Sequence, residues 1–470
     1  MANRNYALVF FAALIFHLAG TWSLPFIDRD EPRFAEASRE MSERHDFVVP
    51  FFNNEPRYDK PPLTYWAQIA SFHVFGENDF GARFPTAVAA ALTAVALFGW
   101  GKRLRDERVG WWAAAIFTLS LQVFVHSKAA VADLWLVLFV TLAHRAAYEL
   151  MAEESDRRRW WWIFYFSLAF AFLAKGPIGW VPLLTVAVAK RFHRGENFRA
   201  RFHFGRGLLL TLAIVCAWGI PALLRTHGEF FAIGIGKHVL GRSVSTMEGH
   251  GASGILSYVA LLPFYFVAVF VSFFPWSIKL PALCRSLRDD HDRADRFLIA
   301  GTLVVFVVFT FVATKLPHYT LPAFPLLALL LAKRTEELKL SRTLAVGAAV
   351  FLFGLALATP LAAKYFPSYV LADVSRPDLQ SRMEFAAVDF TEPSLVWYFR
   401  KHIRGFMTTL RKRKAAEFMT RPGARFIVLP TNEVAELFPD PQPTWQSYRT
   451  IGFNIPKLRC VDVTMLIKSE

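Results

Sequence analysis

Hydrophobic residues in this chain gather in long runs that short polar segments separate. A helix needs about 20 apolar residues to cross a bilayer, so runs of this length are typical of membrane spans. The first run lacks an A-x-A cleavage site and many more runs follow it, which favours a retained helix over a signal peptide. The pattern predicts an all-α polytopic membrane protein with about eleven spans, at 6–25, 84–101, 110–126, 133–151, 160–174, 176–190, 207–224, 258–280, 297–314, 319–333 and 342–362.

The pattern changes near residue 363, where the apolar runs cease and short segments bounded by proline begin. These segments predict strands and short helices, with strands at 385–390, 425–429 and 461–468 and helices at 393–402 and 415–419. The sequence therefore predicts a membrane domain at 1–362, with a first outer loop at about 26–65, and a small α/β domain at 363–470.

Basic residues cluster in the short loops between the predicted spans, and every cluster falls on the same side of the membrane. The clusters lie at 102–108, 157–159, 190–201, 285–288 and 333–334. By the positive-inside rule this side is the cytoplasm. The first long loop and the C-terminal domain are therefore predicted to face outward.

Composition supports a membrane protein and argues against other classes. The chain is 54% hydrophobic and 16% aromatic, with a mean hydropathy of +0.31. Its net charge of +15 comes from basic residues in loops, so nucleic acid is not expected as a partner. The three cysteines show no CxxC spacing, which gives no basis for a disulfide framework or a zinc-thiolate site.

Two charged motifs occur in the first predicted outer loop, DEPR at 30–33 and YDKPP at 58–62. Ionisable groups at a membrane are costly, and they mark functional sites by default. Residues 32–44 carry apolar side chains at helical spacing, which predicts an amphipathic helix on the bilayer surface.

Each charged residue of these motifs has two interpretations. Asp30 and Arg33, one helical turn apart, form an interfacial ion pair, or Asp30 acts as a general base or orients an acceptor hydroxyl while Arg33 keeps it ionised. Lys60 reaches toward the membrane surface, or its compact ammonium group pairs with a substrate phosphate.

Three charged residues at the outer ends of later spans are also open to two interpretations. Asp133 either stabilises a helix N-terminus or contributes to a site. Lys175 and Lys315 lie beside proline at outer helix ends, where lysines ordinarily serve as anchors and where they can also bind an anion.

A further outer loop follows Pro221 and combines glycines with His238 and Arg242. This composition suits a loop that closes over a ligand. Asp59 and His238 together offer oxygen and nitrogen donors, so a metal site is one hypothesis for this pair.

Several motifs in chain order resemble the ArnT-like branch of the GT-C glycosyltransferases, relatives of the protein O-mannosyltransferases. They are DEPRFAE at 30–36, YDKPPLTYW at 58–66, RFP at 83–85, KGP at 175–177 and KLPHYTLP at 315–322. The resemblance covers nearly all of the membrane part, and the C-terminal part matches only in general character. It implies a GT-C membrane fold in the bacterial inner membrane, with interfacial helices, the active site and a small α/β domain on the periplasmic side.

The resemblance also implies a reaction and roles for individual residues. Enzymes of this family transfer a sugar from a polyprenyl phosphate carrier to a periplasmic acceptor such as lipid A, a glycan or a protein. The implied roles are catalysis for Asp30 with Arg33, carrier-phosphate binding for Lys60 and Arg242, a divalent metal ion (Mg²⁺, Mn²⁺ or Zn²⁺) at Asp59 and His238, and substrate binding for Tyr58, Asp133, Lys175, Lys315 and Tyr319.

Three features depart from the aminoarabinose enzymes. Phe34 stands where an aromatic hydroxyl is usual, Asp59 stands where glutamate is usual, and the C-terminal part is shorter. These changes leave the sugar and the acceptor open.

Physical chemistry leads to the same reaction class. A cation stabilises the charge that develops on a leaving phosphate, and a single displacement assisted by Asp30 would invert the anomeric carbon. The chain has no P-loop and no Rossmann glycine fingerprint, so no nucleotide is expected. A transporter or flippase of lipid-linked sugars is the alternative, although such proteins more often show repeated halves and charges near the bilayer midplane.

Overall fold

The computed structural model of the chain describes residues 2–152, 156–192, 198–234, 236, 255–439 and 444–469. It divides into two compact units, and each unit combines separate stretches of the sequence. Unit 1 comprises Met1–Ala19, Tyr58–Ala67 and Arg83–Gly354, and unit 2 comprises Gly20–Arg57, Gln68–Ala82 and Leu355–Glu470. The first predicted outer loop thus falls mostly in the same unit as the C-terminal residues.

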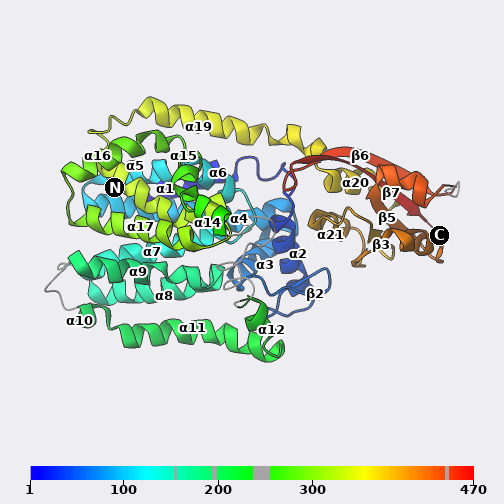
Figure 1. The fold of residues 1–470 in the computed structure, drawn as a ribbon, viewed down its shortest axis with the longest axis horizontal. Helices are drawn as coiled ribbons and strands as arrows, with labels where there is room; N and C mark the ends of the chain where they lie inside the picture. Colours follow the sequence, from blue (N-terminus) through cyan, green and yellow to red (C-terminus); the bar gives the residue numbers. More distant parts are fainter. Residues whose placement is uncertain are drawn as a thin grey trace. The chain divides into compact units, whose positions relative to one another are not determined.

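Unit 1 is helical (Figure 1). Its helices are α1 (Ala2–Leu18), most of α4 (Asp79–Leu104), α5 (Glu107–Thr118), α6 (Leu121–Ser127), α7 (Asp133–Met151), α8 (Arg157–Lys175), α9 (Val181–Ala189), α10 (Phe198–Phe202), α11 (Phe204–Arg225), α12 (Glu229–Phe231), α14 (Ile255–Ala260), α15 (Phe264–Ser272), α16 (Leu280–Asp289), α17 (Arg293–Phe311), α18 (Phe324–Lys333) and most of α19 (Arg342–Leu357). Short 3-10 helices precede α9 (η1, Pro177–Trp180), α16 (η4, Trp276–Lys279) and α18 (η5, Pro317–Ala323). Every predicted apolar run is therefore largely helical.

Fewer helices qualify as single spans than the sequence predicts. Within the described residues, four helices are long and apolar enough to cross a membrane, or six if each of two bent pairs is one span. One of these pairs is α5 with α6, bent by 67°. The run at 258–280 breaks into α14, α15 and η4, with Pro263 and Pro275 at the breaks. Proline lacks the N–H that a continuing helix needs, which explains these interruptions.

Small and polar residues hold the helices of unit 1 together. Helices α7 and α8 run side by side (Figure 1). Between α7 and α9, His144 Nε2 and Thr185 Oγ1 are hydrogen-bonded at 2.9 Å, and both side chains are buried. Near the start of α17, the carboxylate of Asp295 binds Lys333 and Arg334 at 2.8 Å each. These bonds fix the relative register of helices that apolar contacts alone leave free to slide.

Unit 2 contains a five-stranded sheet in the order β4-β3-β5-β7-β6. The strands are β3 (Glu384–Ala387), β4 (Met407–Thr409), β5 (Arg425–Pro430), β6 (Gln446–Asn454) and β7 (Arg459–Lys468). Strand β3 pairs in parallel with β4 and β5, and β7 pairs antiparallel with β5 and β6. The predicted strands at 385–390, 425–429 and 461–468 correspond to β3, β5 and β7.

Helices accompany this sheet, and a short hairpin lies in the first loop. The helices are α2 (Asp30–Glu43), α20 (Pro367–Val374), α21 (Pro393–Phe399), α22 (Ala415–Thr420) and α23 (Thr431–Leu437), with η6 (Thr359–Tyr365), η7 (Arg376–Asp378) and η8 (Lys412–Lys414). Helix α3 (Leu63–Phe75) contributes its second half. The hairpin pairs β1 (Phe51–Phe52) with β2 (Glu55–Pro56). The predicted helices at 393–402 and 415–419 correspond to α21 and α22.

Helix α2 forms where the sequence predicts it, but protein covers the apolar face that the prediction placed against the bilayer. Phe34, Ala37 and Met41 on its apolar face are at most 3% exposed, and α2 packs against α21. Arg39 stacks over the ring of Trp397 at 3.9 Å. The face that periodicity marks as apolar is thus covered by protein, because periodicity shows that a face is buried and does not show what covers it.

One buried acid in unit 2 should make stability depend on pH. The carboxylate of Asp28 accepts hydrogen bonds from the backbone N–H and the hydroxyl of Ser394, each at 2.8 Å. Burial raises the pKa of Asp28 to about 7, and the hydrogen bonds to Ser394 offset only part of this shift. The folded state therefore keeps a proton that the unfolded state releases near pH 4.

We expect Asp28→Asn to remove a loss of stability that the wild type suffers as pH rises. The contribution of Asp28 to the free energy of unfolding is greatest below pH 4. It falls by about 2–4 kcal/mol between pH 4 and 7 and is constant at higher pH. Asparagine can still bond Ser394, so the melting temperature of the variant should exceed that of the wild type increasingly from pH 4 to 7. A difference in melting temperature between variant and wild type that stays the same from pH 4 to 7 would show that Asp28 is ionised in the folded state.

Candidate active site

A well-formed cavity of unit 1 encloses about 700 Å³. Most of its wall is apolar and comes from α8, η1, α9, α11 and α17, including Phe172, Trp180, Trp218 and Phe309. Such a wall suits a ligand with a long hydrocarbon part. Charged side chains interrupt it at only a few positions.

Five residues singled out from the sequence line this one cavity, although they are far apart in the chain. They are Asp59, Lys60, Asp133, Lys175 and Tyr319. Sequence spacing does not predict this convergence, because the helices that carry these residues meet only in the folded bundle. His318 also lines the cavity.

Local chain geometry places Lys175 and Asp133 at facing helix ends. Lys175 is the last residue of α8, and Gly176 then takes a φ of 79°, which a residue with a side chain rarely adopts. Asp133 is the first residue of α7 and lies where the helix dipole favours a negative charge. The Lys175 ammonium donates to Asp133 Oδ1 at 2.5 Å.

Neighbouring side chains give this ion pair an aromatic and a histidine contact. Lys175 Nζ lies 5.5 Å from the ring centre of Tyr319, within the range of a cation–π interaction. His318 Nε2 lies 3.9 Å from Asp133 Oδ1. The side chains of Lys175 and Asp133 are only 16% and 11% exposed, so their charges act in a poorly hydrated setting.

A second ion pair lies in the same wall. Lys60 Nζ donates to Asp59 Oδ1 at 2.7 Å, and the two side chains are 15% and 18% exposed. The cavity thus holds two lysines and two aspartates. An anionic ligand can replace either carboxylate as the partner of a lysine, since each ammonium group has three donors.

Tyr58 precedes this pair and points to another acid. Its hydroxyl donates to Glu229 Oε2 at 3.0 Å, and its ring contacts Phe230 edge-on. Burial, together with the hydrogen bond to Glu229 and the charge of that residue, raises the pKa of Tyr58. Tyr58 therefore stays a neutral donor, and Glu229 is a partner that sequence reasoning did not identify.

Lys315 does not line the cavity. Its ammonium donates to the carbonyls of Phe309 and Thr310 at 3.2 and 2.6 Å, and it lies 5.4 Å from the ring centre of Tyr265. In this position Lys315 stabilises the C-terminal end of α17. This arrangement agrees with the interpretation of Lys315 as an anchor at a helix end.

The remaining predicted site residues lie in other parts of the chain. Asp30 and Arg33 belong to unit 2, in the first turn of α2, where Asp30 is exposed and Arg33 is half-buried. The adjacent Glu31 accepts from the backbone N–H of Ile27 at 2.9 Å. His238 and Arg242 lie outside the described residues.

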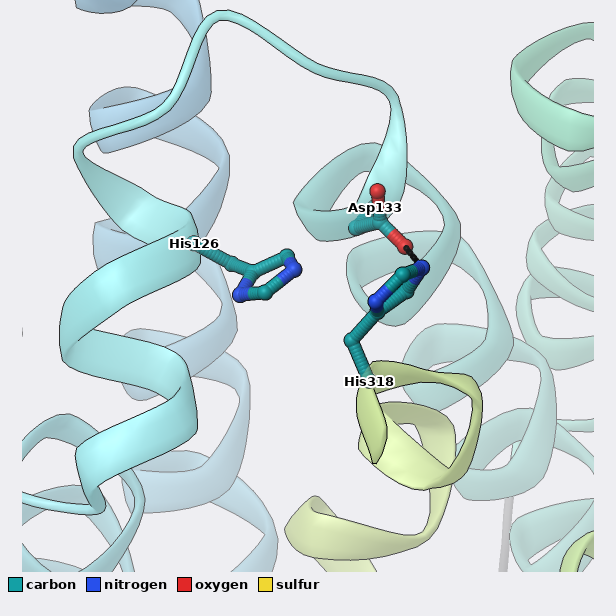
Figure 2. A group of neighbouring side chains, drawn as sticks. All are labelled: His126, Asp133 and His318. Atoms are coloured by element: carbon teal, nitrogen blue, oxygen red, sulfur yellow. Dashed lines mark ion pairs between the residues drawn. The ribbon is translucent and has the colours of Figure 1, made fainter. Parts of the chain in front are cut away.

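Sequence reasoning missed one histidine of the site and gave no role to another. His126, in the last turn of α6, and His318, on η5, approach Asp133 from two sides (Figure 2). Both occur beside residues already singled out, since His126 begins the segment that leads to Asp133 and His318 precedes Tyr319. A histidine next to a candidate site residue is the signal that could have found them.

Comparison with known proteins relates the chain to one group of transferases. A family model described as dolichyl-phosphate-mannose-protein mannosyltransferase matches residues 59–220. The undecaprenyl phosphate-alpha-4-amino-4-deoxy-L-arabinose arabinosyl transferase 2 of Sodalis glossinidius is 30% identical over 317 residues, covering 65% of this chain and 54% of that protein. The corresponding transferase of Aeromonas hydrophila is 27% identical, covering 72% and 61%. The chain thus spans little more than half the length of these two relatives.

Solved structures show the same fold over nearly the whole chain. ArnT from Cupriavidus metallidurans bound to undecaprenyl phosphate aligns with a TM-score of 0.75 and 18% identity, covering 99% of this chain and 98% of that one. The apo state of the same protein aligns with a TM-score of 0.78 and 16% identity. The predicted fold class, a helical membrane part with a small C-terminal α/β part, is confirmed.

Proposed function

We propose that this chain, which belongs to the ArnT-like branch of the GT-C membrane glycosyltransferases, transfers a sugar from a polyprenyl phosphate carrier to an acceptor at the membrane surface. One observation carries the proposal: a large apolar cavity that holds two lysines in its wall. An apolar cavity suits a polyprenyl chain, and a lysine suits the phosphate at its end. Relatives named for undecaprenyl phosphate substrates support the same donor class.

In the proposed reaction the bond between the anomeric carbon of the sugar and the phosphate oxygen breaks. Polyprenyl phosphate, a phosphate monoester, is the leaving group. Lys60 and Lys175 stabilise the negative charge that develops on the departing phosphate, and Arg242 is proposed to join them. Asp30 takes the proton of the acceptor or orients it, with Arg33 in support. Attack from the face opposite the phosphate inverts the anomeric carbon. The substrate-binding roles of Tyr58, Asp133 and Tyr319 belong to the same proposal, and the role of Lys315, which does not line the cavity, stays a prediction.

The proposed metal at Asp59 and His238 can be examined at one of its two ligands. Asp59 Oδ1 accepts from Lys60 at 2.7 Å, and the Asp59 carboxylate is the oxygen ligand in this proposal. His238 lies outside the described residues. Mg²⁺, Mn²⁺ and Zn²⁺ all accept carboxylate oxygen, and such an ion would supply positive charge near the phosphate. The proposed stabilisation of the phosphate by Lys60 and Lys175 does not require this ion.

We also propose the division of the chain into 1–362 and 363–470, and an orientation with the site and C-terminal part in the periplasm of a bacterial inner membrane. The acceptor is a lipid such as lipid A, a glycan or a protein. Cys460 is exposed on β7 and reports on this orientation. In a variant with Cys216 and Cys284 changed to serine, Cys460 should react with a membrane-impermeant maleimide in spheroplasts. Labelling only after lysis would place the C-terminal part in the cytoplasm.

Filling the cavity should block the carrier. Gly219 on α11 lines the cavity, and a Cβ added there meets no atom within 4 Å. We expect Gly219→Phe to fold normally and to weaken polyprenyl phosphate binding and turnover at least about tenfold, because the ring occupies space that the chain requires.

Gly205 on the same helix supplies a matched control. A Cβ at Gly205 also meets nothing within 4 Å, and Gly205 is absent from the cavity wall. Gly205→Phe should therefore bind the carrier as the wild type does. Lipid binding measured by native mass spectrometry distinguishes the two variants, and equal binding by both would remove the cavity from carrier recognition.

A further inference from the structure

Three metal-binding side chains from separate segments meet at the edge of the cavity. His126 comes from α6, Asp133 from α7 and His318 from η5, and one donor atom from each lies within 4.8 Å of the others. Figure 2 shows the His318 ring beside the carboxylate and the His126 ring directed toward it. Two of the three, Asp133 and His318, also line the cavity.

The separations are close to those that a metal ion requires. Bonds of 2.0–2.2 Å to a tetrahedral Zn²⁺ place its donors about 3.3 Å apart. His318 Nε2 and Asp133 Oδ1 are already 3.9 Å apart, and the two imidazole centres are separated by 4.9 Å. All three donor atoms lie within 4.8 Å of one another, a little more than the separation around one ion.

The approach of His318 to Asp133 is poorly explained as an ordinary hydrogen bond. The 3.9 Å between His318 and Asp133 exceeds hydrogen-bond reach, although the two groups face each other. The His126 and His318 rings are tilted by 37°, which is neither a stacked nor an edge-on contact. A metal ion between them would bind both rings and the acid together.

Outer contacts already orient two of the three donors, as is usual for metal ligands. Gln122 Nε2 lies 2.9 Å from His126 Nδ1, and the amide group can present oxygen or nitrogen to that atom. This contact leaves Nε2 as the metal-binding atom of His126. Lys175 donates to Asp133 Oδ1 at 2.5 Å, so Oδ2 is the carboxylate oxygen that we assign to an ion.

We propose that His126 Nε2, Asp133 Oδ2 and His318 Nε2 bind one transition-metal dication, with Zn²⁺ as the expected occupant. Two imidazoles and one carboxylate suit this class of ion and leave a fourth position open for water. The site differs from the pair Asp59 and His238 in every ligand. If the proposed function holds, the ion borders the cavity and its fourth ligand can be a carrier phosphate oxygen.

The test measures metal binding and needs no turnover. Full-length protein without an affinity tag is stripped with EDTA in detergent, loaded with Zn²⁺ and desalted, and its zinc content is determined by mass spectrometry. His126→Gln and His318→Gln should each lower the zinc content by about one ion per chain relative to wild type. His291→Gln, a change at an exposed histidine, should leave that ion in place.

Substitution with Co²⁺ identifies the ligands. The wild type should give the intense visible absorption of a four-coordinate cobalt site, and this absorption should be absent from both histidine variants. Circular dichroism and gel filtration check that the variants are folded. Zinc content unchanged in both His126→Gln and His318→Gln, or lost in Asp59→Asn alone, would overturn the proposal whether or not the protein transfers a sugar.

Discussion

Replacement of Asp30 by asparagine is expected to lower sugar transfer at least about 100-fold, since a positioned general base contributes 10²–10⁴-fold. Asp30 is exposed in the first turn of α2. Asparagine keeps the size of the side chain and cannot accept the proton. Binding of polyprenyl phosphate should change by less than about threefold, because the carrier contacts lie elsewhere in the proposal.

Glu43, in the last turn of the same helix, provides the control. Its carboxylate binds Arg400 at 2.8 Å and has no proposed role in catalysis. Glu43→Gln should transfer sugar at nearly the wild-type rate. Single-turnover measurements on both variants separate the chemical step from binding, and an unchanged rate for Asp30→Asn would exclude Asp30 as the base.

Replacement of Lys60 by methionine is expected to weaken polyprenyl phosphate binding by about 10- to 100-fold. A hydrogen bond to a charged group contributes about 1.5–3 kcal/mol, which corresponds to that range. The variant also leaves Asp59 without the ammonium that now lies 2.7 Å away, and this acid would repel the phosphate. Methionine retains most of the length and apolar surface of lysine, so the cavity wall should persist.

A neutral lipid isolates the contribution of the charge. Polyprenol lacks the phosphate and should bind wild type and Lys60→Met equally. Lys102→Met, at a half-exposed lysine that pairs with Glu107, serves as a control for the loss of a positive charge elsewhere. Equal loss of polyprenol and polyprenyl phosphate binding in Lys60→Met would mean that the substitution disturbs the cavity. Lys60 would then not be a ligand of the phosphate.

The sequence predicts the helical elements well wherever a long apolar run is uninterrupted. The run at 133–151 corresponds to α7 residue by residue. Where proline intervenes, as between α14 and α15, the apolar run predicts one helix and the structure has two. It also fails to predict what covers an apolar face, since the buried side of α2 faces α21 instead of lipid.

Strand β6 shows a different limit. Its buried positions are Thr450, Gly452 and Asn454, and its exposed positions include Ile451 and Phe453. Small and polar residues face inward and apolar ones outward, which is the reverse of the pattern that identifies a strand. Packing in the folded unit decides this orientation, and single-sequence periodicity contains no information about it.

The candidate site was predictable as a set of residues and unpredictable as a geometry. Charge beside a membrane identified Lys60, Asp133 and Lys175, because such groups are costly unless they are used. The structure adds the pairing of Asp133 with Lys175 and the approach of His126 and His318. These contacts join residues up to nearly 200 positions apart, and local patterns do not report on contacts of that range.

The most direct test is to reconstitute the wild-type protein in lipid with a panel of polyprenyl-phosphate sugars and membrane acceptors, and to measure free polyprenyl phosphate by mass spectrometry. Sugar transfer predicts that at least one donor releases polyprenyl phosphate in amounts equal to the glycosylated acceptor, and that release is largely absent with Asp30→Asn. Binding of the donors with no release from any of them, together with their movement across the bilayer, would contradict transfer and identify a transporter.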